Sequence, residues 1–175
     1  VPVLNKFSNK DSSYYISSTS HSLIWSIAQG QADSFQVKLF GAGDCQGTVL
    51  QVQSTVESQY TFSGLQDGNT YSIQVMALSS NGNSDPICSN NLIVDLQAPS
   101  LTITVPAAPT VTGGNQSTIS WTASDLGVSG LKPSQPYKVE LFSNGSCSGS
   151  SQSTIEQGAN SYLWSALVDG IYSVR

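Results

Sequence analysis

Charged residues are scarce in this sequence. Six Lys and Arg stand against eleven Asp and Glu among 175 residues, which gives a charged fraction of 10% and a formal net charge of −5. No run of basic residues is present to neutralise phosphates, so we expect no nucleic-acid partner. Ser, Thr, Asn, Gln and Gly supply the polar surface instead, and exposed strands accept Ser and Thr better than helices do. The composition therefore favours an all-β protein.

Long apolar runs and groups of histidines are also missing. No stretch approaches the roughly 18 apolar residues of a membrane-spanning helix, so we expect no membrane insertion. His21 is the single histidine, which leaves no histidine-based metal site or catalytic triad, and we expect it at the surface. The carboxylates are scattered and form no close pair for glycoside hydrolysis. We therefore expect a protein that is not an enzyme.

Apolar residues recur with a period of two. The stretches 34–40 (SFQVKLF) and 70–77 (TYSIQVMA) alternate between apolar and polar residues, and no segment shows the helical period of 3.6. Segments rich in Gly, Asn and Asp separate these stretches and favour turns. Several short strands with this spacing predict a β-sandwich or a barrel.

The sequence contains an internal repeat. FQVKL at 35–39 aligns with YKVEL at 137–141, and many identities downstream keep the same spacing of 102 residues. Trp25 and Trp121 align with a spacing of 96, so six extra residues fall in the segment SDLGVSGLKPSQ, where a loop can accept them. The repeat predicts two domains, residues 1–97 and 98–175. Pro99, Pro106 and Pro109 indicate an edge strand that is broken or bent at the beginning of the second.

The segment 64–86 (GLQDGNTYSIQVMALSSNGNSDP) resembles the second half of a fibronectin type III module. It has the Gly-Leu pair, a turn at Asp67-Gly68, the tyrosine, an alternating strand and a glycine-containing hairpin. Both tryptophans of the repeat match the buried tryptophan of that family, and Tyr71 and Tyr172 match its corner tyrosine. The resemblance covers 20–95 and most of 115–175. Asp67 and Asp169 stand where the family usually has proline.

The resemblance implies two tandem Ig-like, fibronectin type III-like β-sandwiches. The sequence ends two or three residues into the sixth strand of the second unit, so we expect that unit to lack its last strand. A shortened array explains this most simply. The alternative is strand complementation, with residues 1–20 as a donor segment. We prefer to read 1–7 as an ordinary first strand and 14–17 as an edge strand.

Three cysteines distinguish the sequence from the animal modules and resemble those of bacterial Ig-like surface repeats. Cys45 and Cys147 are equivalent in the repeat, and a counterpart of Cys88 would fall beyond the last residue. We therefore predict a Cys45–Cys88 disulfide and an oxidising compartment, with three free thiols as the alternative. One objection is geometric: a turn after the third strand and the beginning of the seventh can lie at opposite ends of a sheet, whereas bridged Cα atoms lie within about 7 Å.

Four residues are candidates for a binding surface. Phe40 and Phe142 follow a run of inward-facing residues, so we expect them to face outward or to lie at a turn, whereas Trp164 is expected in a core. Asn81 and Asn83 lie in the hairpin loop 79–84. We expect no cofactor. The alternative is a calcium site built from loop aspartates, although a turn-forming role for them is preferred; these are Asp33, Asp44, Asp67, Asp85 and Asp95.

We expect a non-enzymatic segment of a bacterial surface fibre, adhesin or filament, located outside the cell. Its partners would be proteins, cell-surface glycans, neighbouring repeats or other subunits. One alternative is an accessory linker or carbohydrate-binding module of a secreted carbohydrate-active enzyme. Another is a strand-complemented filament subunit.

Overall fold

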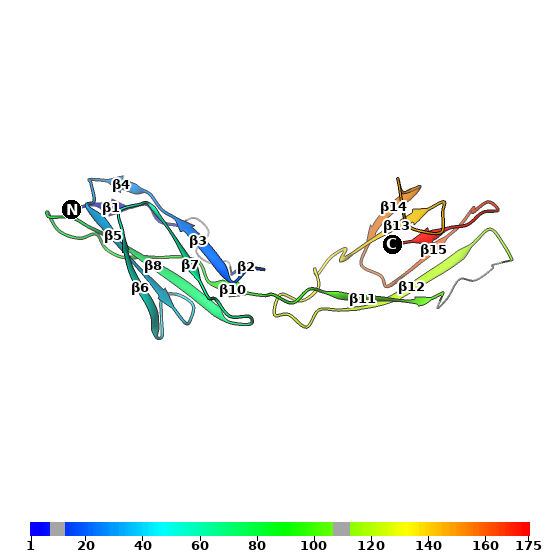
Figure 1. Ribbon diagram of the computed structural model, residues 1–175, viewed down its shortest axis with the longest axis horizontal. Coiled ribbons are helices and arrows are strands. Elements are labelled where there is room, and N and C mark those ends of the chain that lie inside the picture. Colours follow the sequence, from blue (N-terminus) through cyan, green and yellow to red (C-terminus); the bar gives the residue numbers. More distant parts are fainter. Residues whose placement is uncertain (8–12, 107–112) are drawn as a thin grey trace. The chain divides into compact units, whose positions relative to one another are not determined.

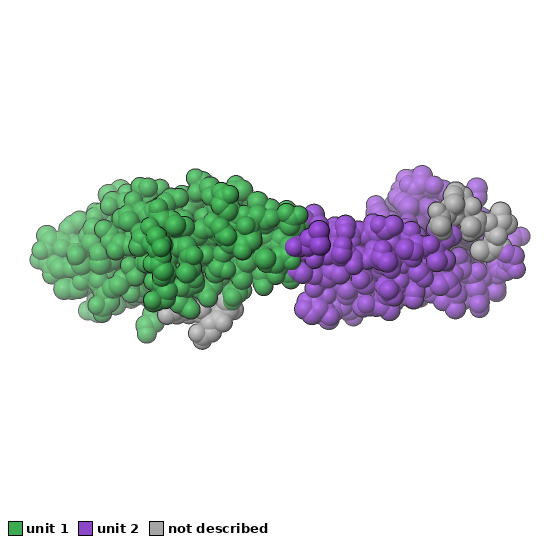
Figure 2. Space-filling view, turned by 90° about the horizontal axis from the view of Figure 1, so that it is seen from below, with its two compact units in different colours: residues 1–97, 127–129 green, residues 98–126, 130–175 purple. Residues whose placement is uncertain are grey.

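The computed structural model describes residues 1–7, 13–106 and 113–175. The regular secondary structure of these residues consists of β-strands. The prediction of an all-β protein is confirmed. The chain divides into two compact units, which are described separately here (Figure 2). Unit 1 comprises residues 1–97 with 127–129, and unit 2 comprises residues 98–126 with 130–175. None of the described residues belongs to a helix that could cross a membrane.

Unit 1 is built from sheets that enclose one core (Figure 1). Its strands in the described part of the chain are β1 (Val3–Leu4), β2 (Tyr14–Ile16), β3 (Ser20–Ile24), β4 (Ile27–Gln29), β5 (Ser34–Phe40), β6 (Val49–Thr55), β7 (Gln59–Ser63), β8 (Thr70–Leu78), β9 (Ile87–Cys88) and β10 (Leu92–Val94). The larger sheet has the order β2-β10-β8-β5-β6, and β9 also pairs with β8. The other layer consists of the pairs β3-β7 and β1-β4.

The alternation predicted from the sequence places the core of unit 1. β5 pairs with β8 along its whole length, with Val37 opposite Val75 and Leu39 opposite Ile73. All four side chains are buried, whereas Lys38 between them lies on the other face of the sheet. Burial of each such side chain contributes roughly 1.5–3 kcal/mol to folding. This central strand pair is therefore the rigid part of unit 1 to which the loops are attached.

The N-terminal segment pairs with strands of unit 1. β1 pairs with β4, and Leu4 is buried in the core. β2 lies alongside β10 in parallel orientation and forms the edge of the larger sheet. Residues 8–12, between β1 and β2, are outside the described residues. The described part of 1–20 thus follows the preferred reading, an ordinary first strand and an edge strand, and makes its contacts within its own unit.

Unit 2 is a smaller sandwich of two three-stranded sheets, β11-β12-β15 and β14-β13-β16 (Figure 1). Its strands in the described residues are β11 (Ser100–Val105), β12 (Ser117–Ser124), β13 (Tyr137–Phe142), β14 (Ser153–Gln157), β15 (Ser161–Trp164) and β16 (Ser173–Val174). β11 is an edge strand between Pro99 and Pro106, as proline predicts. Pro109 lies outside the described residues. The core contains Ile119, Trp121, Val139, Leu141 and Trp164.

Candidate functional site

Cys45 and Cys88 form a disulfide at one end of unit 1, with their Cα atoms 5.9 Å apart. β5 runs antiparallel to β8, so Phe40 at its end pairs with Ser72 near the beginning of β8. β9 also runs antiparallel to β8 and pairs Cys88 with Gln74. The turn after β5 and the strand β9 therefore reach β8 at the same end. The geometric objection to this bond does not apply, because both segments are positioned by one strand.

Side chains of the larger sheet hold the turn that carries Cys45. Ser72 Oγ accepts a hydrogen bond from the N–H of Cys45 at 2.8 Å and donates one to the carbonyl of Ala42 at 2.6 Å. Asn91 Oδ1 accepts a hydrogen bond from the N–H of Asp44 at 2.7 Å. Asp44 and Cys45 have left-handed φ angles of 56° and 53°, which cost roughly 1–2 kcal/mol each outside glycine. The hydrogen bonds and the disulfide offset this cost and fix the turn.

Unit 2 repeats the geometry of this turn without a disulfide. Cys147 also has a left-handed φ, 50°, and its N–H donates a hydrogen bond to Ser173 Oγ at 2.8 Å. Ser173 is the counterpart of Ser72 in the repeat, since each is the residue that follows the corner tyrosine. The Cys147 thiol is free and half-buried. The Gly-x-Cys-x-Gly pattern that the two turns share thus places each cysteine in a left-handed conformation bonded to a serine, although the preceding residue is left-handed only in unit 1.

The fixed turn explains why Phe40 is buried. Phe40 and Ser72 are cross-strand neighbours on the same face of the sheet, and the turn covers this face by bonding to Ser72. Phe40 is consequently 8% exposed, and Phe142, which pairs with Ser173 in unit 2, is 1% exposed. Both rings lie on the outward face that their parity predicts. The prediction that they offer a binding surface is wrong, because the cysteine turns cover them.

A charged cluster covers Phe142 from another side. The Arg175 guanidinium lies over the Phe142 ring, 5.2 Å from its centroid, and donates hydrogen bonds of 3.0 and 2.7 Å to Glu140 Oε2. Lys138 Nζ lies 2.8 Å from Glu140 Oε1. Hydrogen bonds from Lys138 and then from Arg175 lower the pKa of the Glu140 carboxyl. We call Lys138, Glu140 and Arg175 the Glu140 cluster. It lies on β13 and beside β16, and it ties these strands together.

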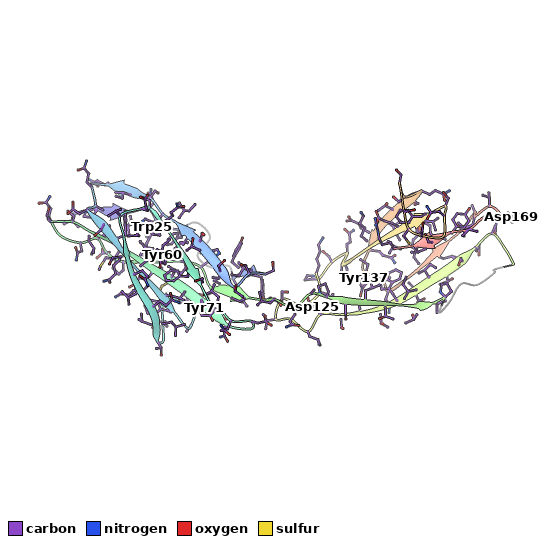
Figure 3. All side chains as sticks on the ribbon, viewed as in Figure 1. Trp25, Tyr60, Tyr71, Asp125, Tyr137 and Asp169 are labelled. Atoms are coloured by element: carbon purple, nitrogen blue, oxygen red, sulfur yellow. A yellow bond between two sulfur atoms is a disulfide. The ribbon has the colours of Figure 1, made fainter. Side chains whose placement is uncertain are left out.

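The tryptophans and corner tyrosines occupy the positions expected of them. Trp25 and Trp121 are 5% and 3% exposed, and Figure 3 labels Trp25 among the side chains of unit 1. Each packs edge-on against an aromatic ring of the facing sheet, Phe35 for Trp25 and Tyr137 for Trp121, at centroid distances of 5.3 and 5.4 Å. Such pairs contribute about 0.5–1.5 kcal/mol beyond area burial. Each sandwich is therefore centred on one indole, and Trp164 is buried as well.

The two corner tyrosines make different hydrogen bonds. The Tyr71 ring is buried, and its hydroxyl oxygen accepts a hydrogen bond from the N–H of Gln66 at 3.0 Å. The Tyr172 hydroxyl donates to the carbonyl of Val168 at 3.1 Å, and its ring is half-buried. The repeat is one residue shorter between the turn and the tyrosine in unit 2. Gln66 and Val168 are equivalent in the repeat, so the two hydroxyls reach the same position through different backbone groups.

A model of the fibronectin type III domain family matches residues 12–89. This range includes Trp25, the corner Tyr71 and both bridged cysteines. Unit 1 is a fibronectin type III domain. Unit 2 repeats its sandwich, so the fold is a tandem of fibronectin type III-like β-sandwiches, as predicted.

Two solved structures are similar to the whole chain. One is the crystal structure of the chicken CNTN1 FN1-FN3 domains, with 11% identity and a TM-score of 0.47; the alignment covers 98% of this chain and 59% of that one. The other is a two-domain fibronectin type III segment from chicken tenascin, with 19% identity and a TM-score of 0.38; it covers 90% of this chain and 82% of that one.

The hairpin loop of the fibronectin type III domain is exposed but hydrogen-bonded. Asn81 and Asn83 are exposed at its tip. The N–H of Asn81 donates to Ser79 Oγ at 3.1 Å, and the N–H of Ser80 donates to Asp33 Oδ2 at 2.8 Å. The two asparagines are thus presented on an ordered turn, which is a suitable position for recognition.

The fibronectin type III domain also contains a pocket that sequence reasoning missed. Its volume is about 240 Å³, and it is lined by Phe7, Tyr14, His21, Leu23, Ile73, Ser89, Asn90 and Leu92. His21 is half-buried there rather than fully solvated, and burial lowers its pKa. Burial thus favours the neutral imidazole, and no Asp, Glu, Lys or Arg lines the pocket. The sequence shows no signal for it, because the lining comes from five separate segments.

Two aspartates considered for calcium bind protein groups. Asp67 accepts hydrogen bonds of 2.8 Å from Gln97 Nε2 and from the N–H of Leu96, and these bonds, with Gln97 first, lower the pKa of its carboxyl. Asp33 accepts the bond from the hairpin loop described above. Among the described residues, no group of three or more His, Cys, Asp or Glu lies together in a way that could hold a metal ion. Both carboxylates thus act as acceptors for turns.

Proposed function

We propose that this chain is a non-enzymatic structural and adhesive segment of a bacterial surface fibre, adhesin or filament, in which tandem sandwiches space or present a binding element. The observation that carries the proposal is the Cys45–Cys88 disulfide within a fibronectin type III domain. Such bonds persist in oxidising compartments, and extracellular domains use them to support small cores. The segment therefore acts outside the cell, at its surface.

The use of side chains supports a structural role. The tryptophans and Phe40, Phe62 and Phe142 are buried in cores or beneath the cysteine turns. Exposed positions are dominated by Ser, Thr, Asn and Gln, and the charged fraction is 10%. A surface of this kind stays soluble without strong long-range fields, which suits a spacer that must not bind charged partners at random. Partners would contact loops such as 79–84, or neighbouring repeats and subunits.

Thiol labelling on intact cells tests the proposal. Cells that make the protein are shaved with trypsin, and the released peptides are alkylated in denaturant without a reductant. We expect peptides of the chain in the shaved fraction, with Cys45 and Cys88 joined and Cys147 alkylated as the internal control. Alkylated Cys45 and Cys88, or release of the peptides only after lysis, would contradict an extracellular segment.

A carbohydrate-binding accessory module is the second candidate, and the pocket of unit 1 favours it. Tyr14 on β2 is 57% exposed and lines this uncharged pocket, so its ring offers a face on which a sugar can stack. A glycan array tests this function, with Tyr14→Ala as the variant and Tyr15→Ala as the control, because Tyr15 lies on the same strand, is 48% exposed and does not line the pocket. Binding that Tyr14→Ala abolishes and Tyr15→Ala preserves supports the module. An array without hits rejects it.

A further inference from the structure

The strand β6 is a long edge of the larger sheet of unit 1. It is seven residues long and pairs with β5 on one side, and no strand of the described residues pairs with its other side. Backbone N–H and C=O groups along that side therefore point away from the sheet. Native proteins usually protect such an edge with lysine, proline or a short strand. β6 contains no lysine or proline and is not short, and its register shifts only at its beginning.

The sequence around β6 is uncharged and apolar where it is exposed. Residues 46–56 (QGTVLQVQSTV) contain no Asp, Glu, Lys, Arg or Pro. Leu50 and Val52 share one face of the strand and are 50% and 51% exposed, and Val49 and Val56 are exposed as well. A bulge lies at the beginning of β6, and Gln51–Thr55 keep a regular register against β5. Exposed segments with this composition pair readily with other strands.

The equivalent edge of unit 2 carries the protection that β6 lacks. At the repeat spacing of 102, Val49, Leu50 and Val52 correspond to Ser151, Gln152 and Thr154. Ser54 corresponds to Glu156, which is exposed on β14. The two units thus differ at the equivalent edge strands β6 and β14. Because β14 is polar, the fold does not require exposed apolar residues at this position, and they are specific to unit 1.

We propose that β6 is a self-association edge, at which β6 of a second copy of this chain adds antiparallel and joins the two larger sheets into one. This inference does not depend on the function proposed above. An antiparallel pair of identical strands is related by a two-fold axis, so the same residues meet from both sides. The polar residues of one β6 strand, which are Gln, Ser and Thr, then lie opposite residues of the same strand in the second copy. Because β6 contains no charged residue, no like charges oppose one another within the pair.

Charge on the neighbouring strand does not prevent this pairing. Lys38 of β5 lies opposite Val52, one strand in from the edge. In the joined sheet the two copies of Lys38 are three strand spacings apart, about 14 Å. This exceeds the Debye length of about 8 Å at physiological ionic strength, so their repulsion is largely screened. The interface is small, and association is therefore expected between micromolar and millimolar concentrations.

Val52 is the position at which the proposal is tested. In antiparallel registers centred on residues 51 to 53, the two copies of Val52 lie directly opposite or diagonally, about 5–8 Å apart. Val52→Lys then places two ammonium groups together. Its side chain is half in solvent in the monomer, and the new ammonium group lies opposite Lys38 of its own chain, so a modest like-charge cost to unit 1 is expected. Thr154→Lys introduces the same side chain at the equivalent exposed position of unit 2 and is the control, although its cross-strand neighbour is Glu140 rather than a lysine.

Sedimentation velocity over micromolar to millimolar concentration measures the association of the full chain. We expect wild type and Thr154→Lys to dimerise as concentration rises, and Val52→Lys to weaken the dimer about tenfold or more. A mixture of Val52→Lys and Val52→Glu should restore the dimer, because opposite charges then meet. A wild type that stays monomeric, a Val52→Lys variant that associates like wild type, or a mixture without restoration would each overturn the proposal. Circular dichroism of each variant establishes that the sandwich is intact.

Discussion

Removal of the Cys45–Cys88 disulfide should destabilise unit 1 by about 4 kcal/mol. The bond closes a segment with a sequence separation of 43 residues. Loop-closure entropy for this length amounts to about 13 cal/mol/K, which is about 4 kcal/mol at 25 °C. The hydrogen bonds of Ser72 and Asn91 to the turn do not require the disulfide, so most of the loss comes from the freer unfolded chain. The paired variant Cys45→Ser/Cys88→Ser avoids an unpaired thiol at either position.

Native-state hydrogen exchange measures this loss for each unit separately. Both the variant and its reference carry Cys147→Ser, which prevents thiol exchange with unit 2. The amide of Val75 in β8 reports the opening of unit 1, and the amide of Trp121 in β12 reports the opening of unit 2. We expect the free energy of opening to fall for Val75 and to stay constant for Trp121. The usual decrease on removal of a disulfide is about 2–4 kcal/mol. A decrease of less than about 1 kcal/mol for Val75 would refute the entropy argument. An equal fall in both units would refute their independence.

Three further changes test the cores and the charged cluster. Tyr71→Phe should lower the free energy of unfolding, measured in urea, by about 0.5–1.5 kcal/mol because a partly buried hydrogen bond is lost. Tyr172→Phe should lower it less because its hydrogen bond is exposed. Equal decreases would contradict this difference between the two tyrosines. Phe40→Ala should cost about 3–5 kcal/mol, as expected for a buried ring, and a variant of unchanged stability would show that the cysteine turn does not cover it. The Glu140 cluster lowers the folded pKa of its carboxyl, so its stabilisation is complete above the unfolded pKa of about 4.3 and is lost as pH falls through the lower folded value. Urea unfolding at several pH values should show this loss in wild type and not in Glu140→Gln, and identical pH profiles would exclude the ion pairs as its cause.

The sequence predicts the architecture well because strand alternation and the repeat are local or periodic signals. In β5 and β8, side chains alternate between the two faces of the sheet, so their apolar residues identify the core without knowledge of their partners. The repeat then transfers each assignment from one unit to the other. Trp25 and Trp121 could be placed in the cores in this way, and so could the turns that carry Cys45 and Cys147.

The exposure of the outward-facing rings could not be predicted in the same way. Alternation correctly places Phe40 on the face of the sheet that points away from the main core. The ring is buried there because Ser72, 27 residues after Cys45 in the sequence, binds the turn that covers it. Side-chain hydrogen bonds over such separations leave no periodic pattern. The recurrence of Ser72 and Ser173 at matching positions was the signal available, and serine is too common in this sequence for that match to stand out. The pocket around His21 leaves no sequence signal either, because its lining comes from five separate segments.

The disulfide also determines how unit 1 would respond to a pulling force. β2 and β10 are neighbours in parallel orientation, so tension between the beginning of β2 and residue 97 acts along their hydrogen-bonded pair in shear and loads its bonds together. Once this pair yields, the segment between Cys45 and Cys88 still cannot lengthen. About 150 Å of contour length stays locked until the bond is reduced. The redox state of one covalent bond thus sets how far the domain can extend under load.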